Sequence, residues 1–293
     1  MREAPAVVPR WKEAVERDLA ATLERTGAEA PRLAEAMRHA VLGGGKRLRP
    51  LVVLATAHAL GADTSRALPA ASAVELVHCY SLVHDDLPSM DDDVLRRGRP
   101  TVHVAYGEAL AVLAGDALQS LAFERLFDSE LPPGTVRQQG LVLARAAGAS
   151  GMAGGQALDL AASRGATTAA ELRRMQELKT GALLAASFEL GALAAGAPPG
   201  EVARLGDAGR KAGLAFQIRD DVLDRTGATE RLGKTAGKDD RQMKATWPAL
   251  VGLDGATRLA EELAAEVLAL LADLGPRAEP LRWLVQRLIE RPA

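Results

Sequence analysis

Residues 78–103 hold the densest set of side chains in the sequence that could carry out chemistry. Five aspartates lie within nine positions, directly after the apolar segment 70–83: Asp85, Asp86, Asp91, Asp92 and Asp93. Three arginines follow them: Arg96, Arg97 and Arg99. Like charges this close repel one another. A solvated acidic face would tolerate the repulsion, but the adjoining apolar segment 70–83 favours a bound counter-ion instead. Hard oxygen ligands favour Mg²⁺, which typically binds through one or two carboxylates, waters and substrate phosphates. The arginines would then hold those phosphates in forked hydrogen bonds.

A second acidic stretch follows 135 positions after the first, at residues 216–224. On a helix its polar members fall at i, i+3, i+4 and i+7 and form one stripe: Gln217, Asp220, Asp221 and Asp224. Carboxylates buried there without a partner would cost on the order of several kcal/mol. A solvent-exposed helix end would explain this stretch alone. Two such stretches in one chain, each beside basic residues, favour a shared phosphate-bearing ligand.

The first acidic stretch follows a similar helical register. His78, Ser81 and Asp85 fall at i, i+3 and i+7 and therefore share one side of a helix. A lone His78 would more often be a core histidine, but its register with Asp85 favours the site. Pro88 disturbs the helix because it has no N–H to donate. We expect the chain to turn there and bring Asp91 back towards Asp85.

Basic residues that could bind phosphate lie on both sides of these stretches. Gly43, Gly44 and Gly45 precede three cations, Lys46, Arg47 and Arg49, at a helix start that could bind a diphosphate. The spacing differs from that of a Walker-type loop, and a helix break with solvated cations remains the alternative. Lys179 with Thr180, and Lys234 with Lys244, would supply cations for a second phosphate group.

The elements that position these residues are predicted to be helical almost throughout, because no alternating strand pattern persists for six residues. Helices are expected at 7–25, 31–42, 48–60, 68–87, 108–127, 135–149, 168–195, 201–224, 258–274 and 281–290. The breaks between them are too short for domain linkers. We therefore predict one all-α domain over residues 1–293, a helical bundle whose long helices enclose a central cavity.

Composition excludes several classes of protein. The net charge of −2, from 36 basic and 38 acidic residues, gives no overall attraction to nucleic acid or to an anionic membrane. The single cysteine, Cys79, excludes an internal disulfide and fits a reducing, cytoplasmic location. The first ten residues lack the apolar run of a secretory signal. The most apolar window, 181–199, carries Glu189 and is mostly alanine and glycine, so we expect no membrane span.

Together these motifs resemble the polyprenyl (isoprenyl) diphosphate synthase family, and in particular its bacterial farnesyl type. The resemblance runs from the glycine-rich segment at 44–50 onward. It includes the two aspartate motifs at 85–91 and 220–224, Arg96-Arg97-Gly98, Gly115-Asp116, Gly154-Gly155-Gln156 with Asp159, Lys179-Thr180-Gly181 and Phe216-Gln217. Thr246-Trp247, where the family more often has Thr-Tyr or Thr-Phe, and a C-terminus without the usual tyrosine are its departures.

The resemblance implies head-to-tail prenyl transfer to an allylic diphosphate such as dimethylallyl or geranyl diphosphate, usually by a homodimer. The implied metal ligands for three Mg²⁺ are Asp85, Asp91 and Asp220, supported by Asp86, Asp221 and Asp224. The implied contacts to the allylic diphosphate are Arg96, Lys179, Lys234 and Lys244. The implied residues for isopentenyl diphosphate are Gly45, Lys46, Arg49, His78 and Arg97. Thr180 and Gln217 would stabilise the allylic cation.

Product length is expected to depend on bulk below the first aspartate motif. Tyr80 lies five residues before Asp85, roughly 7.5 Å along a helix axis, and Ser81 is small, so Tyr80 would form the floor. This pattern favours farnesyl diphosphate, with geranylgeranyl or geranyl diphosphate as alternatives. A terpene cyclase would not need the glycine-rich site, and a non-catalytic partner subunit would usually lack one aspartate motif. A nucleic-acid-binding helical protein would account for the arginines but not for the aspartates beside them.

Overall fold

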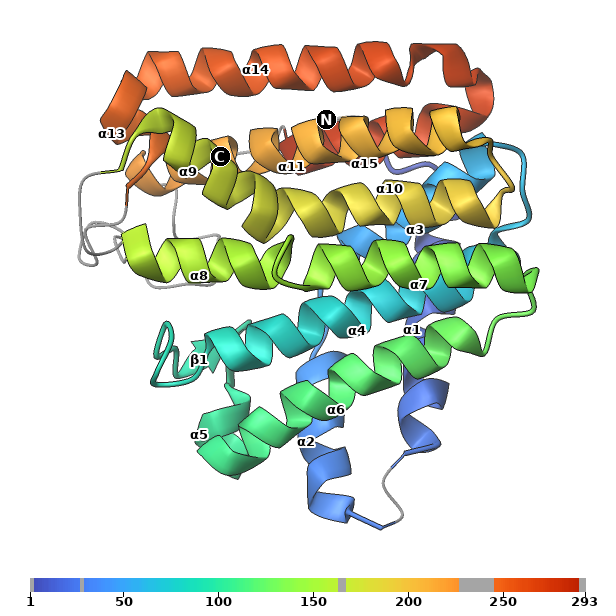
Figure 1. Ribbon diagram of the computed structural model, residues 1–293, viewed down its shortest axis with the longest axis vertical. Coiled ribbons are helices and arrows are strands. Elements are labelled where there is room, and N and C mark those ends of the chain that lie inside the picture. Colours follow the sequence, from blue (N-terminus) through green and yellow to red (C-terminus); the bar gives the residue numbers. More distant parts are fainter. Residues whose placement is uncertain (1–2, 27–28, 163–166, 227–244, 290–293) are drawn as a thin grey trace.

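The computed structural model describes residues 3–26, 29–162, 167–226 and 245–289, which fold into packed α-helices (Figure 1). The helices are α1 (Val7–Glu24), α2 (Pro31–Leu42), α3 (Leu48–Ala59), α4 (Leu68–Asp85), α5 (Val102–Tyr106), α6 (Glu108–Phe127), α7 (Pro133–Ala147), α8 (Met152–Ala162), α9 (Ala169–Gln176), α10 (Ala182–Ala194), α11 (Pro199–Arg225), α13 (Trp247–Val251), α14 (Leu253–Leu270) and α15 (Glu279–Ile289). Shorter elements are the 3₁₀ turns η1 (Thr64–Ala67), η4 (Ala272–Leu274) and η5 (Pro276–Ala278), the π-helical turn η2 (Glu177–Gly181), and a hairpin of β1 (Leu95–Arg96) and β2 (Arg99–Pro100). The all-α prediction is confirmed, whereas the predicted central cavity stays a prediction.

Helix α10 lies at the centre of the packing and is buried on nearly all its faces. It packs against α3, α4, α7 and α11. Small residues allow this close approach: a β-carbon on Gly191 would lie 2.4 Å from the carbonyl oxygen of Val53 in α3. The alanine- and glycine-rich segment therefore serves close helix packing. Across the described residues, no helix is both long and apolar enough to cross a lipid bilayer.

Apart from shifts of up to five residues at their ends, the predicted helices agree with the structure except in five places. Helices 31–42 and 108–127 match at both ends, because a proline begins the first and Gly107 precedes the second. The predicted helix 168–195 is instead interrupted by the π-helical turn η2. The hairpin, α5, α8 and α13 were not predicted, because segments of two to eleven residues carry little periodicity. Three of these differences, the π turn, the hairpin and α8, lie beside the acidic stretches.

The C-terminal ends of α4, α8 and α11 lie on the same side of the molecule, at the left of Figure 1. Helix α8 packs against η2, which in turn packs against α11. The two acidic stretches, at the ends of α4 and α11, are therefore brought to one end of the bundle.

Candidate active site

The first aspartate motif forms a compact turn at the C-terminus of α4. The backbone N–H of Asp91 donates to the carbonyl oxygen of Asp85 at 2.9 Å, and that of Asp93 to Asp86 at 3.2 Å. Asp92 has a φ of 51°, a left-handed conformation that asparagine and aspartate adopt more readily than most residues. The predicted return of Asp91 to Asp85 is confirmed by this hydrogen bond. Two half-buried carboxylates thus share one turn.

Asp86 holds the β1–β2 hairpin, which carries Arg96, Arg97 and Arg99, against this turn. Asp86 is 3% exposed, and the Nε of Arg96 lies 2.9 Å from both of its carboxylate oxygens. Burial opposes the charge on Arg96, but the hydrogen bonds and charge of Asp86 outweigh it and raise the arginine's pKa. Arg97 and Gly98 both have positive φ and form the two-residue hairpin turn. The Arg-Gly pair was the signal in the sequence that could have predicted this hairpin.

Arg97 connects the hairpin to the glycine-rich loop between α2 and α3. Its guanidinium donates to the carbonyl oxygen of Gly44. Gly45 has a φ of 149°, a backbone conformation that residues with a β-carbon rarely adopt, so glycine is favoured there. A β-carbon at this position would also lie 2.6 Å from Nη1 of Arg97. The backbone of the glycine-rich loop therefore lies in close contact with the guanidinium of Arg97.

Arg49 and His78 lie beside this loop, at the start of α3 and in α4. The Nε of Arg49 is buried and has no hydrogen-bond partner within the described ranges. Burial lowers the pKa of both Arg49 and His78. The positive charges of Arg49 and Arg97 lower the pKa of His78 further. The structure thus gathers two arginines and a neutral histidine around the glycine-rich loop. An anion would meet the unsatisfied donor of Arg49.

Arg47 does not share the setting of Arg49 and Arg97. Its side chain is directed into the core, where it pairs with Glu16 and Glu75. The prediction that all three cations of the loop could bind a diphosphate is therefore wrong for Arg47. A buried glutamate in α4, Glu75, was the signal that sequence reasoning missed, because a buried carboxylate needs a buried cation.

Helix α8 links the first aspartate motif to the π-helical turn η2. The side-chain amide of Gln156 donates to Asp85, and Nζ of Lys179 donates to Asp159 at 2.6 Å. A β-carbon on Gly155 would lie 2.1 Å from the backbone nitrogen of Lys179, so only glycine allows this approach. The backbones of α8 and η2 are in direct contact here.

The π turn continues the connection to the second aspartate motif. The hydroxyl of Thr180 donates to Oε1 of Gln217 in α11 at 2.9 Å, one turn before Asp220. π-Helical turns occur frequently at functional sites, where they change the direction in which side chains project. A series of hydrogen bonds thus connects Asp85 through α8 and η2 to α11. The same helices therefore position both aspartate motifs.

The three carboxylates of the second motif are not equivalent. Asp220 and Asp224 are half-buried, whereas Asp221 is 8% exposed. Asp221 accepts from the amide of Gln176 at 3.2 Å and from the backbone N–H of Trp247 at 3.1 Å. The indole of Trp247 in turn donates to Gln176 at 2.7 Å. Asp221 therefore fastens α11 to α9 and α13, and Trp247 fills the position where the sequence departs from the family pattern.

The remaining predicted residues lie in several settings. Lys46 is exposed at the glycine-rich loop. Lys234 and Lys244 lie outside the described residues. Tyr80 is 8% exposed and contacts the ring of His84 edge to face, with centroids 5.9 Å apart. Its hydroxyl bonds to Gln119 of α6. The hydroxyl of Ser81 donates to the carbonyl oxygen of His78 at 2.8 Å.

The donor set suits a hard cation bound together with phosphate. Asp85, Asp91 and Asp220 offer carboxylate oxygens, which Mg²⁺ prefers over softer ligands. Within the described part of the chain, no three His, Cys, Asp or Glu residues are grouped as a metal site. Mg²⁺ commonly takes only one or two carboxylates and completes its shell with water and substrate phosphates. The residues present therefore fit Mg²⁺ bound with a phosphorylated substrate.

Comparison with known proteins identifies this arrangement. The family model described as polyprenyl synthetase matches residues 30–272 of the chain. The chain belongs to the polyprenyl synthetase family. Two farnesyl diphosphate synthases are similar to it. The one from Geobacillus stearothermophilus is 47% identical, over 84% of this chain and 83% of that protein. The one from Escherichia coli is 46% identical, over 88% of each.

The fold of the chain agrees with solved structures over almost its entire length. The geranyltransferase from Helicobacter pylori, complexed with magnesium and isoprenyl diphosphate, superposes with a TM-score of 0.85 at 34% sequence identity. The alignment covers 99% of this chain and 100% of that structure. The family resemblance found in the motifs is thereby confirmed for sequence and fold.

Proposed function

We propose that the protein is a prenyltransferase that condenses isopentenyl diphosphate head-to-tail with an allylic diphosphate, with farnesyl diphosphate as the main product. The hydrogen-bonded framework that joins Asp85 to Gln217 carries this proposal. It connects the two aspartate motifs with Lys179, and Asp86 holds Arg96 at the same end of the bundle. Family membership and the two farnesyl diphosphate synthases similar to the chain support it. We also propose that residues 1–293 form a single domain.

The reaction begins with ionisation of the allylic substrate. The carbon–oxygen bond breaks and its electron pair leaves with diphosphate. Arg96 and Lys179 are held near the aspartates by Asp86 and Asp159, and they would stabilise the charge that develops on the leaving group. Bound Mg²⁺ would be held by Asp85, Asp91 and Asp220, three ions in all, and would neutralise the diphosphate.

The second half of the reaction uses the glycine-rich loop. Gly45, Lys46, Arg49, His78 and Arg97 would bind the diphosphate of isopentenyl diphosphate. Its double bond attacks the allylic carbon, a carbon–carbon bond forms, and a proton passes to the departed diphosphate. Thr180 and Gln217, whose side chains are hydrogen-bonded to each other, are proposed to stabilise the allylic cation. Lys234 and Lys244 are proposed as further diphosphate contacts. No side-chain base is required.

An assay with both substrates tests the proposal directly. Purified protein is incubated with dimethylallyl diphosphate, isopentenyl diphosphate and Mg²⁺, and the prenyl products are measured by chromatography after dephosphorylation. We expect turnover only when both substrates and Mg²⁺ are present. Turnover of the allylic diphosphate alone would indicate a terpene cyclase, and no turnover with either substrate set would indicate a non-catalytic partner subunit.

Product length is proposed to depend on Tyr80. Its buried ring lies between α4 and α6, where it contacts His84 and Gln119. We expect Tyr80→Ala to shift the main product towards geranylgeranyl diphosphate, because removing the ring leaves room for another isoprene unit. Tyr80→Phe keeps the ring and should leave the product unchanged. A product profile in Tyr80→Ala equal to that of the unmodified protein would exclude Tyr80 as the floor.

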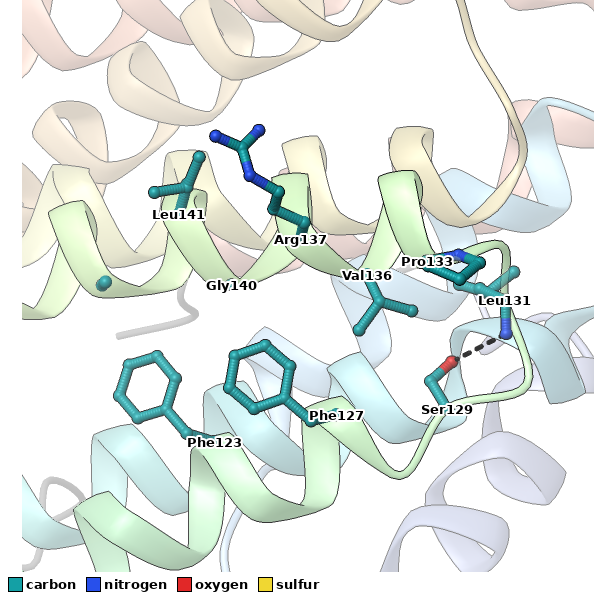
Figure 2. Close-up of a pocket in the computed structure, with 10 residues that line it drawn as sticks. Phe123, Phe127, Ser129, Leu131, Pro133, Val136, Arg137, Gly140 and Leu141 are labelled. Carbon is teal, nitrogen blue, oxygen red and sulfur yellow. Dashed lines mark hydrogen bonds between the residues drawn. The ribbon is translucent and has the colours of Figure 1, made fainter.

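We also propose that the protein forms a homodimer through α6 and α7. Apolar side chains are exposed on these helices, among them Leu113 at 51% and Phe127 at 57%. Figure 2 shows Phe123 and Phe127 directed towards Val136 and Gly140 of α7, in a pocket of about 550 Å³. Exposed apolar surface of this kind marks protein interfaces. Sedimentation equilibrium should give twice the 30.7 kDa of one chain, and Phe127→Asp should lower that mass.

A further inference from the structure

Arg47 lies inside the protein, at the junction between the glycine-rich loop and α3. The residue is 2% exposed, and its side chain contacts three helices. Its Nε and Nη2 donate to the two carboxylate oxygens of Glu16 in α1, at 2.8 and 3.0 Å. Its Nη1 donates to Glu75 in α4 at 2.8 Å, and Nη2 also donates to the carbonyl oxygen of Val41 in α2 at 2.6 Å. One guanidinium therefore joins α1, α2 and α4.

The charges of Arg47, Glu16 and Glu75 stabilise one another only while their hydrogen bonds are kept. Glu75 is 2% exposed, and the side chain of Glu16 is 33% exposed. Burial opposes the charge on Arg47, but the two carboxylates outweigh it and raise the arginine's pKa. A buried ion pair is stable only if its hydrogen bonds are satisfied. Lysine cannot reproduce the planar fork that reaches both oxygens of Glu16 and also Glu75.

The cluster is attached directly to residues proposed to bind isopentenyl diphosphate. Arg47 follows Lys46 and precedes Arg49 by two positions, and Glu75 lies one helical turn before His78 in α4. Arg47 has a φ of 51°, a left-handed conformation that is unfavourable for a residue with a β-carbon. Contacts elsewhere must hold such a conformation, and those of its own guanidinium do so. The ion pair thus fixes the direction in which the loop enters α3.

We infer that Arg47 is a positioning residue for the second substrate. It holds Gly45, Lys46 and Arg49 in register with His78 through its bonds to Glu16 and Glu75, and it does not touch the substrate itself. This inference rests on the proposed binding of isopentenyl diphosphate at the glycine-rich loop. It gives the buried Glu75 of α4 a part in substrate recognition, through its ion pair with Arg47.

Kinetics with each substrate varied in turn test this role. We expect Arg47→Lys and Glu75→Gln to raise the KM for isopentenyl diphosphate by roughly ten- to a hundredfold, because misplacement of about 1 Å has effects of this size. The KM for the allylic diphosphate should change by no more than about twofold, since its proposed contacts lie at the aspartate motifs. Calorimetric titration of isopentenyl diphosphate should show the same weakening in Kd.

Glu16→Gln provides a variant that is expected to fold even if the others do not. Glu16 lies at the partly exposed side of the cluster, and glutamine keeps one hydrogen bond to Arg47. Its KM for isopentenyl diphosphate should rise in the same direction but less than in Arg47→Lys. Equal KM values in Glu16→Gln and the unmodified protein would overturn the inference.

A second ion pair serves as a matched control for loss of stability. Arg125 in α6 donates to both oxygens of Asp18 in α1, at 3.0 and 2.8 Å, and is distant in sequence from the loop. Arg125→Lys should lower Tm and leave both KM values unchanged. If the Arg47 variants lower Tm while the KM for isopentenyl diphosphate stays constant, Arg47 is only structural. Absence of any prenyl transfer by the unmodified protein would instead refute the proposed function.

Discussion

Replacing Asp85 or Asp220 by alanine is expected to lower kcat/KM for prenyl transfer by at least about a thousandfold, about 4 kcal/mol of transition-state stabilisation. Each replacement removes a proposed Mg²⁺ ligand at one side of the diphosphate. The developing charge on the leaving group would then lack its main counter-charge. Steady-state rates at saturating Mg²⁺, with both substrates varied, measure the loss.

The same variants should remain folded. Asp85 is the last residue of α4, where a carboxylate meets the negative end of the helix dipole. Its removal relieves this repulsion but also removes the acceptor of the Gln156 amide, so Tm in the absence of Mg²⁺ should change little. Asp273→Ala, at an exposed position near the end of α14, is the control and should retain full activity. Activity within tenfold of normal in Asp85→Ala or Asp220→Ala would refute the metal assignment.

Gly155→Ala is expected to have the second largest effect, at a residue that touches no substrate. An added β-carbon would lie 2.1 Å from the backbone nitrogen and 2.5 Å from the Cα of Lys179. Backbone atoms cannot rotate away, so α8 and η2 must separate, and overpacking of this kind costs about 1–3 kcal/mol. The separation would pull Gln156 from Asp85 and Lys179 from Asp159. We expect kcat to fall by about a hundredfold.

Thermal unfolding and product assays on Gly155→Ala measure the two consequences separately. Tm should fall by about 2–4 °C for each kcal/mol lost in a chain of this size. Gly200→Ala in the first turn of α11 is the control, because its β-carbon would meet no atom within 4 Å. It should keep normal activity and an equal or higher Tm. Normal kcat in Gly155→Ala would show that α8 does not position the site.

The sequence was most informative where the chemistry depends on residue spacing along one helix. The register of His78 with Asp85, and that of Gln217 with Asp220, follows from helical periodicity and needs no tertiary information. Pro88 marked the turn that returns Asp91 to Asp85. The family was identifiable for the same reason, since its motifs are short runs of neighbouring residues.

Long-range pairing accounts for what sequence reasoning missed. Arg47 and Arg49 are both arginines beside glycines, and only the fold shows that Glu16 and Glu75 withdraw the first into the core. Asp221 likewise looks equivalent to Asp220 in the sequence. In the structure its carboxylate instead accepts hydrogen bonds from Gln176, at the end of α9, and from Trp247, at the start of α13. These distinctions depend on partners 26 to 45 positions away, which helical periodicity does not encode.

The two-residue turn at Arg97 and Gly98 has a thermodynamic consequence. Arg96 on one side of it is bound to Asp86, and Arg97 is bound to the carbonyl oxygen of Gly44. Adjacent residues of a tight hairpin cannot shift independently, so we expect occupancy of either proposed diphosphate position to alter the free energy of filling the other. Such linkage is reciprocal: whichever molecule arrives first, the change in affinity it causes equals the change it would experience if it arrived second.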